Sequence, residues 1–111
     1  MKVSVQIRLG PTAETEDRPV RRIVDYARRI EAAGFSGIWV GDSLGRGRPT
    51  LDPLVALATL CAVTERVELG IAVLQVPLRH PVELAHRVQS VQVLSGGRLH
   101  AMSERLDARR F

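Results

Sequence analysis

The chain has 111 residues and few of the residue types that mark several classes of protein. It contains one cysteine, Cys61, which excludes an internal disulfide, and the apolar residues around it predict a buried, unreactive thiol. No run reaches the roughly 18 consecutive apolar residues of a membrane span. The first ten residues alternate apolar and polar types, unlike the apolar core of a signal peptide. We therefore expect a cytoplasmic protein without membrane contact.

Aromatic residues are also scarce, although the formal net charge is +4. Tyr26, Phe35, Trp39 and Phe111 are the only ones, and none lies within a run of basic residues as a nucleic-acid stacking platform requires. The 16 basic residues, all arginine except Lys2, are scattered among acids. This distribution indicates solvated helix faces, and we expect no nucleic-acid partner.

The histidines do not have the spacing of metal ligands. His80 and His86 are six positions apart, so they lie on different faces of any helix that holds both, and no acid joins them at ligand spacing. His80 precedes Pro81 and is expected to cap a helix, whereas His86 is expected to face solvent. Ser43 lies outside any G-x-S-x-G motif, which argues against a serine hydrolase. We expect no metal site.

Apolar periodicity alternates between the strand and the helix pattern along the chain. It predicts strands over residues 3–9, 37–41 and 68–76, with a further strand start near Arg98, and helices over 18–33, 52–64 and 81–94. A spacing of about thirty residues between strand starts matches the βαβ unit, whose parallel strands need a crossover helix. The fold class is therefore α/β, built from consecutive right-handed parallel βα repeats.

Capping residues support these helices. Asp17 is expected to cap the first helix with Pro19 in its first turn, and Gly34 is expected to end it. Asp52 followed by Pro53 predicts the start of the second helix.

Asp42 is the first ionisable residue after the short apolar strand in "GFSGIWVGDS". Ligands of parallel α/β folds bind at the carboxyl ends of the strands, so Asp42 is a candidate ligand contact. The alternative is a capping aspartate that turns back onto its own loop amides. In the loop that follows, Gly45 and Gly47 lack the rest of a phosphate-binding fingerprint, which favours a flexible loop over a phosphate clamp made by Arg46 and Arg48.

An ordered set of segments resembles a known family. "GFSGIWVGDS", "TERVELG", "PLRHPVELA" and "LSGGRL" are similar to the luciferase-like flavin-dependent oxidoreductases, over about residues 2–99. That family includes bacterial luciferase, alkanesulfonate monooxygenases, and dehydrogenases and reductases that use the deazaflavin coenzyme F-420. The resemblance implies a (β/α)₈ barrel of the TIM type with FMN or coenzyme F-420 at its C-terminal rim. It also implies oxidoreductase chemistry, either hydride transfer or oxygen activation, on an unidentified small-molecule substrate.

The resemblance also implies site residues. Family members hold the isoalloxazine ring against a bulge in the third strand that contains a non-proline cis peptide, and this feature maps onto Ala72 and Val73. Asp42 maps to a position near the reactive face of the cofactor, which implies a catalytic and cofactor-binding role. Relatives that use F-420 often have histidine after this aspartate. Ser43 stands there in this chain, so the usual proton donor is absent.

A complete barrel has eight strands and about 250 residues, far more than this chain. We expect residues 1–99 to form a partial barrel of three βα units and residues 100–111 to form a divergent charged tail. Leu99, Met102 and Leu106 have helical spacing, which predicts that the fourth strand is missing or replaced by a short helix.

Three interpretations of the short chain stay open. It is a truncated family member with little activity alone, a small subunit that completes a barrel by association, or a minimal non-catalytic binding domain. An open parallel sheet leaves edges and faces that another surface must cover. We therefore expect self-association or a partner chain over the open sheet.

Overall fold

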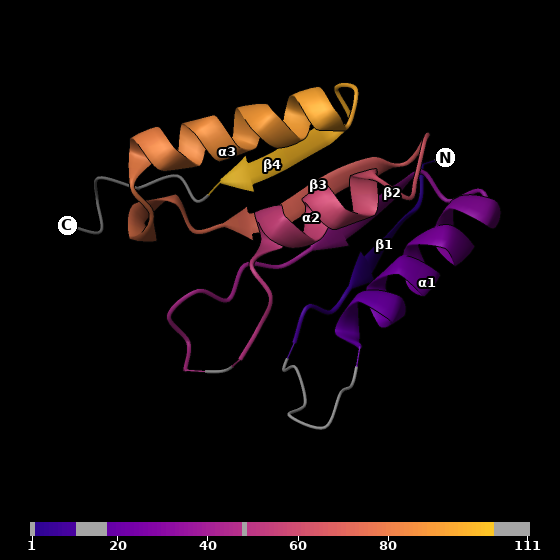
Figure 1. Ribbon diagram of the computed structural model, residues 1–111, viewed down its shortest axis with the longest axis horizontal. Coiled ribbons are helices and arrows are strands. Elements are labelled where there is room, and N and C mark those ends of the chain that lie inside the picture. Colours follow the sequence, from indigo (N-terminus) through magenta and orange to yellow (C-terminus); the bar gives the residue numbers. More distant parts are fainter. Residues whose placement is uncertain (1, 11–17, 48, 104–111) are drawn as a thin grey trace.

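The computed structural model describes residues 2–10, 18–47 and 49–103 (Figure 1). Along the chain, strands alternate with helices, and a short 3₁₀ turn precedes the last helix. The elements are β1 Ser4–Ile7, α1 Pro19–Ala32, β2 Gly37–Val40, α2 Pro53–Cys61, β3 Glu68–Leu74, η1 Val76–Leu78, α3 Pro81–Leu94 and β4 Leu99–Ser103. None of the helices within these ranges is both long and apolar enough to cross a membrane, and a cytoplasmic location stays a prediction.

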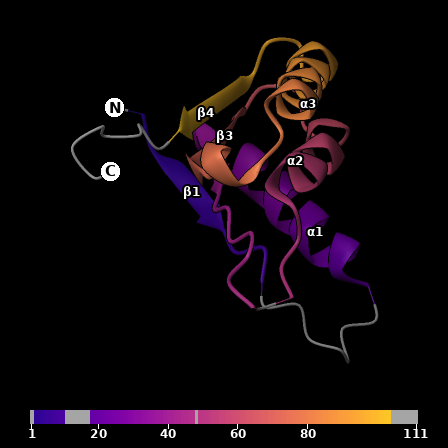
Figure 2. The same ribbon diagram turned by 90° about the vertical axis from the view of Figure 1, so that its left-hand side faces the viewer.

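The strands form one parallel sheet in the order β1-β2-β3-β4, so each strand pairs with the strand that precedes it along the chain. The three helices lie on the same side of this sheet (Figure 2). This arrangement is the beginning of a βα barrel, and it confirms the predicted fold class. The predicted elements are all present, and no boundary differs from its predicted position by more than three residues.

The prediction that a fourth strand is missing is wrong. Residues Leu99–Ser103 form β4, which pairs with β3 through Leu69 and Leu99 and through Ile71 and Ala101. Leu99 is buried and His100 is exposed, which is the alternation of a strand. The open edge of β3 supplies hydrogen-bond partners that override the weak helical spacing. Residues 104–111, including Leu106, lie outside the described structure, so a chain division after residue 99 stays a prediction.

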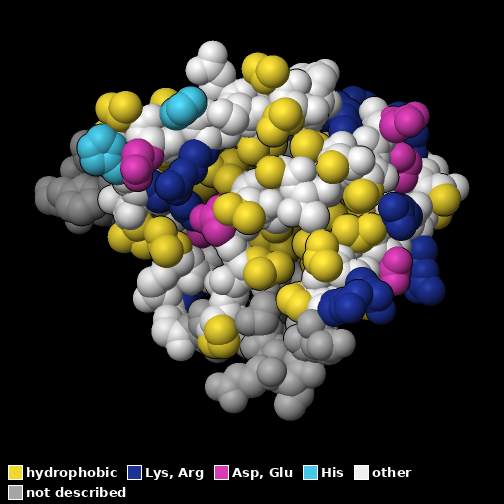
Figure 3. Space-filling model, in the orientation of Figure 1, with side chains coloured by type: hydrophobic (Ala, Val, Ile, Leu, Met, Phe, Trp, Pro, Cys, Tyr) yellow, Lys and Arg dark blue, Asp and Glu magenta, His cyan; other side chains and the backbone are white. Residues whose placement is uncertain are grey.

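The core lies between the sheet and the helices. Ile38, Val40, Leu69 and Ile71 point toward the helices and are completely buried, as are several side chains that pack on them from α1 and α2. Figure 3 shows hydrophobic side chains over the middle of the helical face, where α2 lies, and basic side chains toward the end occupied by α1. The amphipathic pattern of α1 therefore separates the core from solvent as predicted.

The opposite face of the sheet is polar. Gln6, Trp39, Gly70 and His100 form one row across the four strands, and no element within the described ranges covers this row. Gly70 is required here because the indole of Trp39 lies over it. A Cβ atom at Gly70 would lie 2.4 Å from ring atoms of Trp39. This face corresponds to the interior of a barrel.

The expected caps are present with two differences. Asp52 accepts a hydrogen bond from the amide of Val55 at 3.1 Å, and Gly34 has a φ of 87°, as a helix-ending glycine does. Asp17 lies outside the described residues, and Arg18 occupies the cap position of α1 without a side-chain hydrogen bond. His80 occupies the cap position of α3, but its side chain makes no capping bond.

Glu31 joins the end of α1 to the turn between α2 and β3. Its carboxylate accepts hydrogen bonds from the backbone amides of Glu65, Arg66 and Val67 at 2.9–3.1 Å. Burial raises the pKa of Glu31, but the three backbone N–H donors and the nearby Arg66 charge outweigh it, so the pKa is lowered. The ionised carboxylate therefore stabilises the entry of the chain into β3.

We predict that Glu31 makes the folded state sensitive to acid. Because its pKa is lowered on folding, its contribution is complete above the ordinary value of 4.5 and is lost as the pH falls through the lower folded value. Urea unfolding at pH 7 and at steps below pH 4.5 should show a steeper loss of stability in the wild type than in Glu31→Gln. Glu83→Gln, an exposed glutamate on α3, is the control and should follow the wild type. Parallel pH curves for the wild type and Glu31→Gln would contradict this role.

Candidate functional site

Asp42 lies two residues after the end of β2, at the carboxyl end of the sheet, as predicted. Its carboxylate is buried, with 1% of the side chain exposed. Arg79 donates to both carboxylate oxygens through Nη2 at 2.9 Å and to Oδ2 through Nε at 3.3 Å. The amide of Gln75 donates to the same carboxylate at 2.9 Å, and the amide of Leu44 donates at 3.3 Å. Asp42 therefore connects its own loop with the end of β3.

Arg79 also binds Asp52, the capping residue of α2. Its Nη1 donates to Oδ1 of Asp52 at 3.0 Å, and only 9% of the arginine side chain is exposed. Burial lowers the pKa of Arg79, but the hydrogen bonds that it donates to Asp42 and Asp52, together with the charges of these two carboxylates, outweigh burial and raise the pKa. One guanidinium therefore ties together the loop after β2, the start of α2 and the segment before α3. We refer to Asp42, Asp52 and Arg79 as the rim cluster.

Asp42 makes the contact onto its own loop that one of the two predicted roles requires, and it also binds protein groups beyond that loop. The Leu44 hydrogen bond is the turn onto its own loop, and the Gln75 and Arg79 bonds direct the carboxylate toward the end of β3. The side chain amide of Gln75 also donates to the backbone carbonyl of Asp42 at 2.6 Å. The structure therefore confirms the position of Asp42 at the rim, and its predicted catalytic and cofactor-binding role stays a prediction.

β3 is irregular at Ala72 and Val73, where the resemblance places the cofactor wall. The peptide bond between these two residues is cis, and the register with β4 shifts between Ala72 and Leu74. Both side chains are exposed, Val73 to 40%. The bulged, non-proline cis segment is therefore present at the expected residues, and a surface of β3 is open there.

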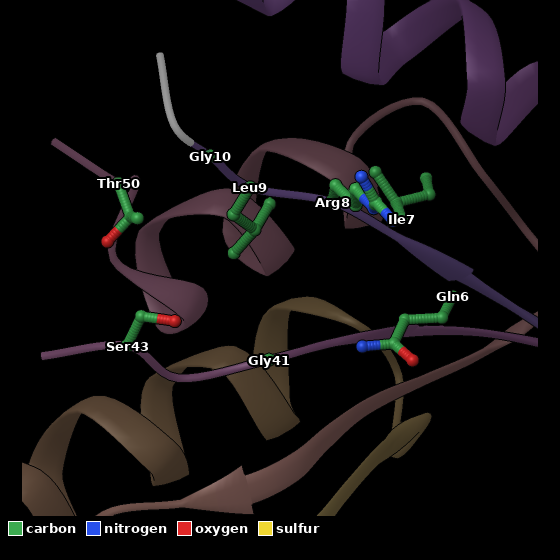
Figure 4. Close-up of a pocket in the computed structure, with 8 residues that line it drawn as sticks. All are labelled: Gln6, Ile7, Arg8, Leu9, Gly10, Gly41, Ser43 and Thr50. Carbon is green, nitrogen blue, oxygen red and sulfur yellow. The ribbon is translucent and has the colours of Figure 1, made fainter. Parts of the chain in front are cut away.

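A hollow of about 370 Å³ lies at the carboxyl ends of β1 and β2 (Figure 4). Its walls come from the end of β1 and from the two ends of the loop between β2 and α2. The lining residues are Gln6, Ile7, Arg8, Leu9, Gly10, Gly41, Ser43 and Thr50. The two walls are fastened together by the hydrogen bond from the amide of Leu51 to the carbonyl of Leu9 at 3.1 Å.

Gly41 connects this hollow with the bulge of β3. A Cβ atom at Gly41 would lie 3.9 Å from the carbonyl oxygen of Ala72 and 3.8 Å from Nε2 of Gln6. These are ordinary contact distances, so the missing side chain leaves space between the hollow and Ala72. Gly41 therefore lines the hollow and also lies next to Ala72, so the hollow and the bulge are neighbours at the carboxyl edge of the sheet.

Comparison with known proteins identifies the family. A family model described as luciferase-like monooxygenase matches residues 1–102. The chain belongs to the luciferase-like monooxygenase family.

Two characterised relatives carry out different reactions. The chain is 31% identical over 91 residues to 4-hydroxyprotoasukamycin monooxygenase from Streptomyces nodosus subsp. asukaensis, covering 81% of this chain and 24% of the relative. It is 36% identical over 98 residues to F-420-dependent glucose-6-phosphate dehydrogenase from Beutenbergia cavernae, covering 84% of this chain and 29% of the relative. The chain therefore spans less than a third of the length of these relatives.

A solved structure agrees with the fold. The oxygenating constituent of 3,6-diketocamphane monooxygenase from Pseudomonas putida, solved in complex with FMN, superimposes with a TM-score of 0.74 at 14% identity. The match covers 94% of this chain and 29% of that protein. The luciferase-like chain described here is thus similar in fold to part of a larger enzyme.

The loop between β2 and α2 has the glycine geometry of a turn. Gly45 and Gly47 have φ angles of 78° and 72°, a region that favours glycine, and Arg46 is exposed. Arg48 lies outside the described residues, so the phosphate clamp considered for Arg46 and Arg48 stays a prediction. The glycines account for the course of the loop without any bound phosphate.

The histidines and the cysteine are placed as follows. His86 is exposed, and Cys61 is buried in α2, where its thiol donates to the carbonyl of Ala58. His100 lies on the polar face of the sheet, with Nε2 3.9 Å from a carboxylate oxygen of Glu68. Within the described ranges, no three His, Cys, Asp or Glu side chains are grouped as metal ligands.

The sequence interpretation missed Arg79, Gln75 and Gly41. Arg79 is 37 positions from Asp42, and no local pattern pairs them. One signal was available, because Arg79 follows β3 as Asp42 follows β2, and the carboxyl ends of neighbouring parallel strands meet at one edge. Gly41 was treated as the end of an apolar run, although a glycine before the rim aspartate indicates a place where space is needed.

We predict that Arg79→Met destabilises the fold by about 3–5 kcal/mol, because it leaves the buried Asp42 carboxylate without its charge partner. In a double-mutant cycle, Asp42→Asn should recover part of this loss in the Arg79→Met background, since it removes the unpaired charge. Guanidinium unfolding followed by the fluorescence of Trp39 measures all four proteins. Arg87→Met, which changes an exposed arginine of α3, is the control and should have little effect. Additive losses for the two rim substitutions would show that the pair is not coupled.

Proposed function

We propose that this chain forms the part of a luciferase-like oxidoreductase that holds one side of a flavin or deazaflavin ring. The observation that carries the proposal is that Gly41, which lines the hollow at the ends of β1 and β2, lies next to Ala72 in the exposed bulge of β3. In parallel βα barrels, the carboxyl ends of the strands are the edge at which ligands bind. Membership of the luciferase-like family supports a flavin or deazaflavin as the ligand at this edge.

The residues present fit a flat ring system at this position. Gly41 leaves open the space that a Cβ atom would fill, beside the Ala72 carbonyl, and Val73 presents an exposed apolar side chain. FMN or coenzyme F-420 would supply hydride transfer or oxygen activation when bound. The relatives named above support both options, because one is a monooxygenase and the other depends on F-420.

Each rim residue has a separate task in this proposal. Ala72 and Val73 form the wall against which the ring packs, and the amide of Gln6 is placed to hydrogen-bond a polar ring edge near Gly41. Asp42 acts as a positioning residue, since Gln75 and Arg79 occupy its carboxylate. By holding Gln75, which follows β3, Asp42 keeps the bulge in register with the end of β2. Orientation of the ring and exclusion of water are the contributions of the protein.

We predict that Gly41→Leu weakens cofactor binding by about tenfold, equivalent to about 1.4 kcal/mol, because its side chain fills the space beside Ala72. FMN and F-420 would each be titrated into the purified chain and followed by cofactor fluorescence. Ala32→Leu adds the same side chain at the exposed end of α1, at the opposite end of the sheet, and should bind like the wild type. Unfolding curves should show that both variants remain folded.

Equal affinities in these two variants would place the cofactor away from Gly41. A short DNA duplex, titrated at two salt concentrations, tests the nucleic-acid alternative that the positive charge raised. Salt-sensitive DNA binding without any FMN or F-420 binding would overturn the proposed function.

We also propose that a second copy of the chain covers the polar face and the free strand edges. β1 and β4 are each paired on one side only within the described structure, and unpaired edges are sites of strand addition. Trp39 lies on the open face, and Val73 near the end of β3 is exposed. A partner chain that supplies further strands is the alternative.

The expected assembly is a multiple of 12.2 kDa. Light scattering coupled to gel filtration measures this mass over a range of concentrations. A single 12.2 kDa species at all concentrations would exclude self-association, and it would leave a different chain as the cover.

A further inference from the structure

The hollow beside β1 has an unbalanced positive charge. Arg8 is the one charged residue among its lining residues, and its guanidinium forms no hydrogen bond or ion pair with any described residue. Its backbone is fixed, because the Arg8 carbonyl accepts a hydrogen bond from Nη1 of Arg22 at 2.9 Å. The backbone of Arg8 is therefore anchored by a hydrogen bond, and the N–H donors of its exposed guanidinium are available to a ligand.

The two acids at the ends of the described part of the β2–α2 loop do not neutralise this charge. Asp42 lies between the lining residues Gly41 and Ser43, but its carboxylate is turned away from the hollow and bound by Arg79. Asp52, at the end of the same loop, is bound by Arg79 as well. The rim cluster thus keeps both carboxylates of the loop away from Arg8.

Neutral hydrogen-bond donors complete the lining. The hydroxyl groups of Ser43 and Thr50 and the side-chain amide of Gln6 lie at the hollow, and none has a hydrogen-bond partner within the described ranges. Figure 4 shows Ser43 and Gln6 extending toward Gly41 from opposite sides. One guanidinium with hydroxyl and amide donors, and with no free carboxylate among the described lining residues, is a set that matches an oxyanion.

We propose that this hollow binds the carboxylate or phosphate group of a small-molecule substrate, with Arg8 as its charge partner. A guanidinium binds such groups through two parallel N–H donors, which fixes orientation as well as position. The inference rests on the proposed function, because Gly41 opens the hollow toward the bulge where the cofactor ring is placed. The substrate would therefore be anchored at β1, with its reacting part directed toward β3.

The test uses the full chain labelled with ¹⁵N, and inorganic phosphate and acetate as separate probes. Ionic strength is held constant with chloride, so that general screening does not change during the titration. The amide signals of Gly10, Gly41 and Ser43 should shift in a saturable way, and the stronger probe identifies the class of oxyanion. Arg8→Gln should weaken this binding by at least about fivefold, and Arg8→Lys should weaken it less, because it keeps the charge but loses the planar fork.

Two further arginine variants locate the effect. Arg87→Gln on α3 should bind like the wild type. Arg46→Gln should also bind the probes like the wild type, since Arg46 does not line the hollow. Weaker binding in Arg46→Gln, with unchanged binding in Arg8→Gln, would instead place the oxyanion at the loop between β2 and α2. Shifts spread over the surface, or equal affinity in Arg8→Gln and the wild type, would overturn the proposal.

A comparison of FMN with riboflavin separates substrate from cofactor. The two differ by the phosphate group, so Arg8→Gln should reduce the affinity for both equally or for neither. A selective loss of FMN affinity would place the cofactor phosphate in the hollow and overturn the substrate assignment. Binding of phosphate or acetate without binding of flavin or F-420 would support the oxyanion site in the hollow and contradict the proposed function. Binding of flavin or F-420 without binding of phosphate or acetate would contradict only the role of Arg8.

Discussion

The buried ion pair between Asp42 and Arg79 is the constraint on which the carboxyl edge of the sheet depends. Both side chains are almost completely removed from solvent, so each charge would be costly without the other. Together with Asp52, the pair fixes the loop after β2, the start of α2 and the segment after β3 in one arrangement. The hollow and the bulge keep their relative positions because these three segments cannot move independently.

The opposite edge of the sheet is held by a different type of contact. Arg98 donates to the backbone carbonyls of Cys61, Thr64 and Val67, and Glu31 accepts from the backbone amides of the same turn. These contacts use the charged side chains to bind peptide groups of the turn between α2 and β3. At the carboxyl edge, the charges of the rim cluster are paired with one another, and Arg8 and the other donors of the hollow stay available. In βα barrels generally, the carboxyl edge of the sheet carries the functional site and the opposite edge contributes to stability, and the two edges of this sheet follow the same division.

The sequence predicts most of the fold because its signals are local. Apolar periodicity, the Asp52 cap and Gly34 depend on neighbours within a few residues, and all were placed correctly. The repeat spacing indicated a strand start near Arg98, but the helical spacing of the residues that follow led to the wrong prediction of a missing fourth strand, because β4 depends on the free edge of β3, some thirty residues away. Arg79 was missed because its partner Asp42 is also distant in the sequence, 37 positions away. Ala72 and Val73 came from the family resemblance, since nothing in their side chains indicates a bulge.

The polar face of the sheet links the fold to the function. The apolar residues of β2 predict that both faces of this strand are buried. On the face opposite to the helices, however, its side chain is Trp39, which lies between Gln6 of β1 and the backbone of Gly70 of β3. Glu68 is on the same face, and its Oε1 lies 3.5 Å from Nζ of Lys2 and 3.9 Å from Nε2 of His100. A dry apolar layer packed on this face would leave those groups without water or partners, which costs free energy. Whatever surface completes the barrel must therefore bring polar groups or water to this face, as the interior of a ligand-binding barrel does.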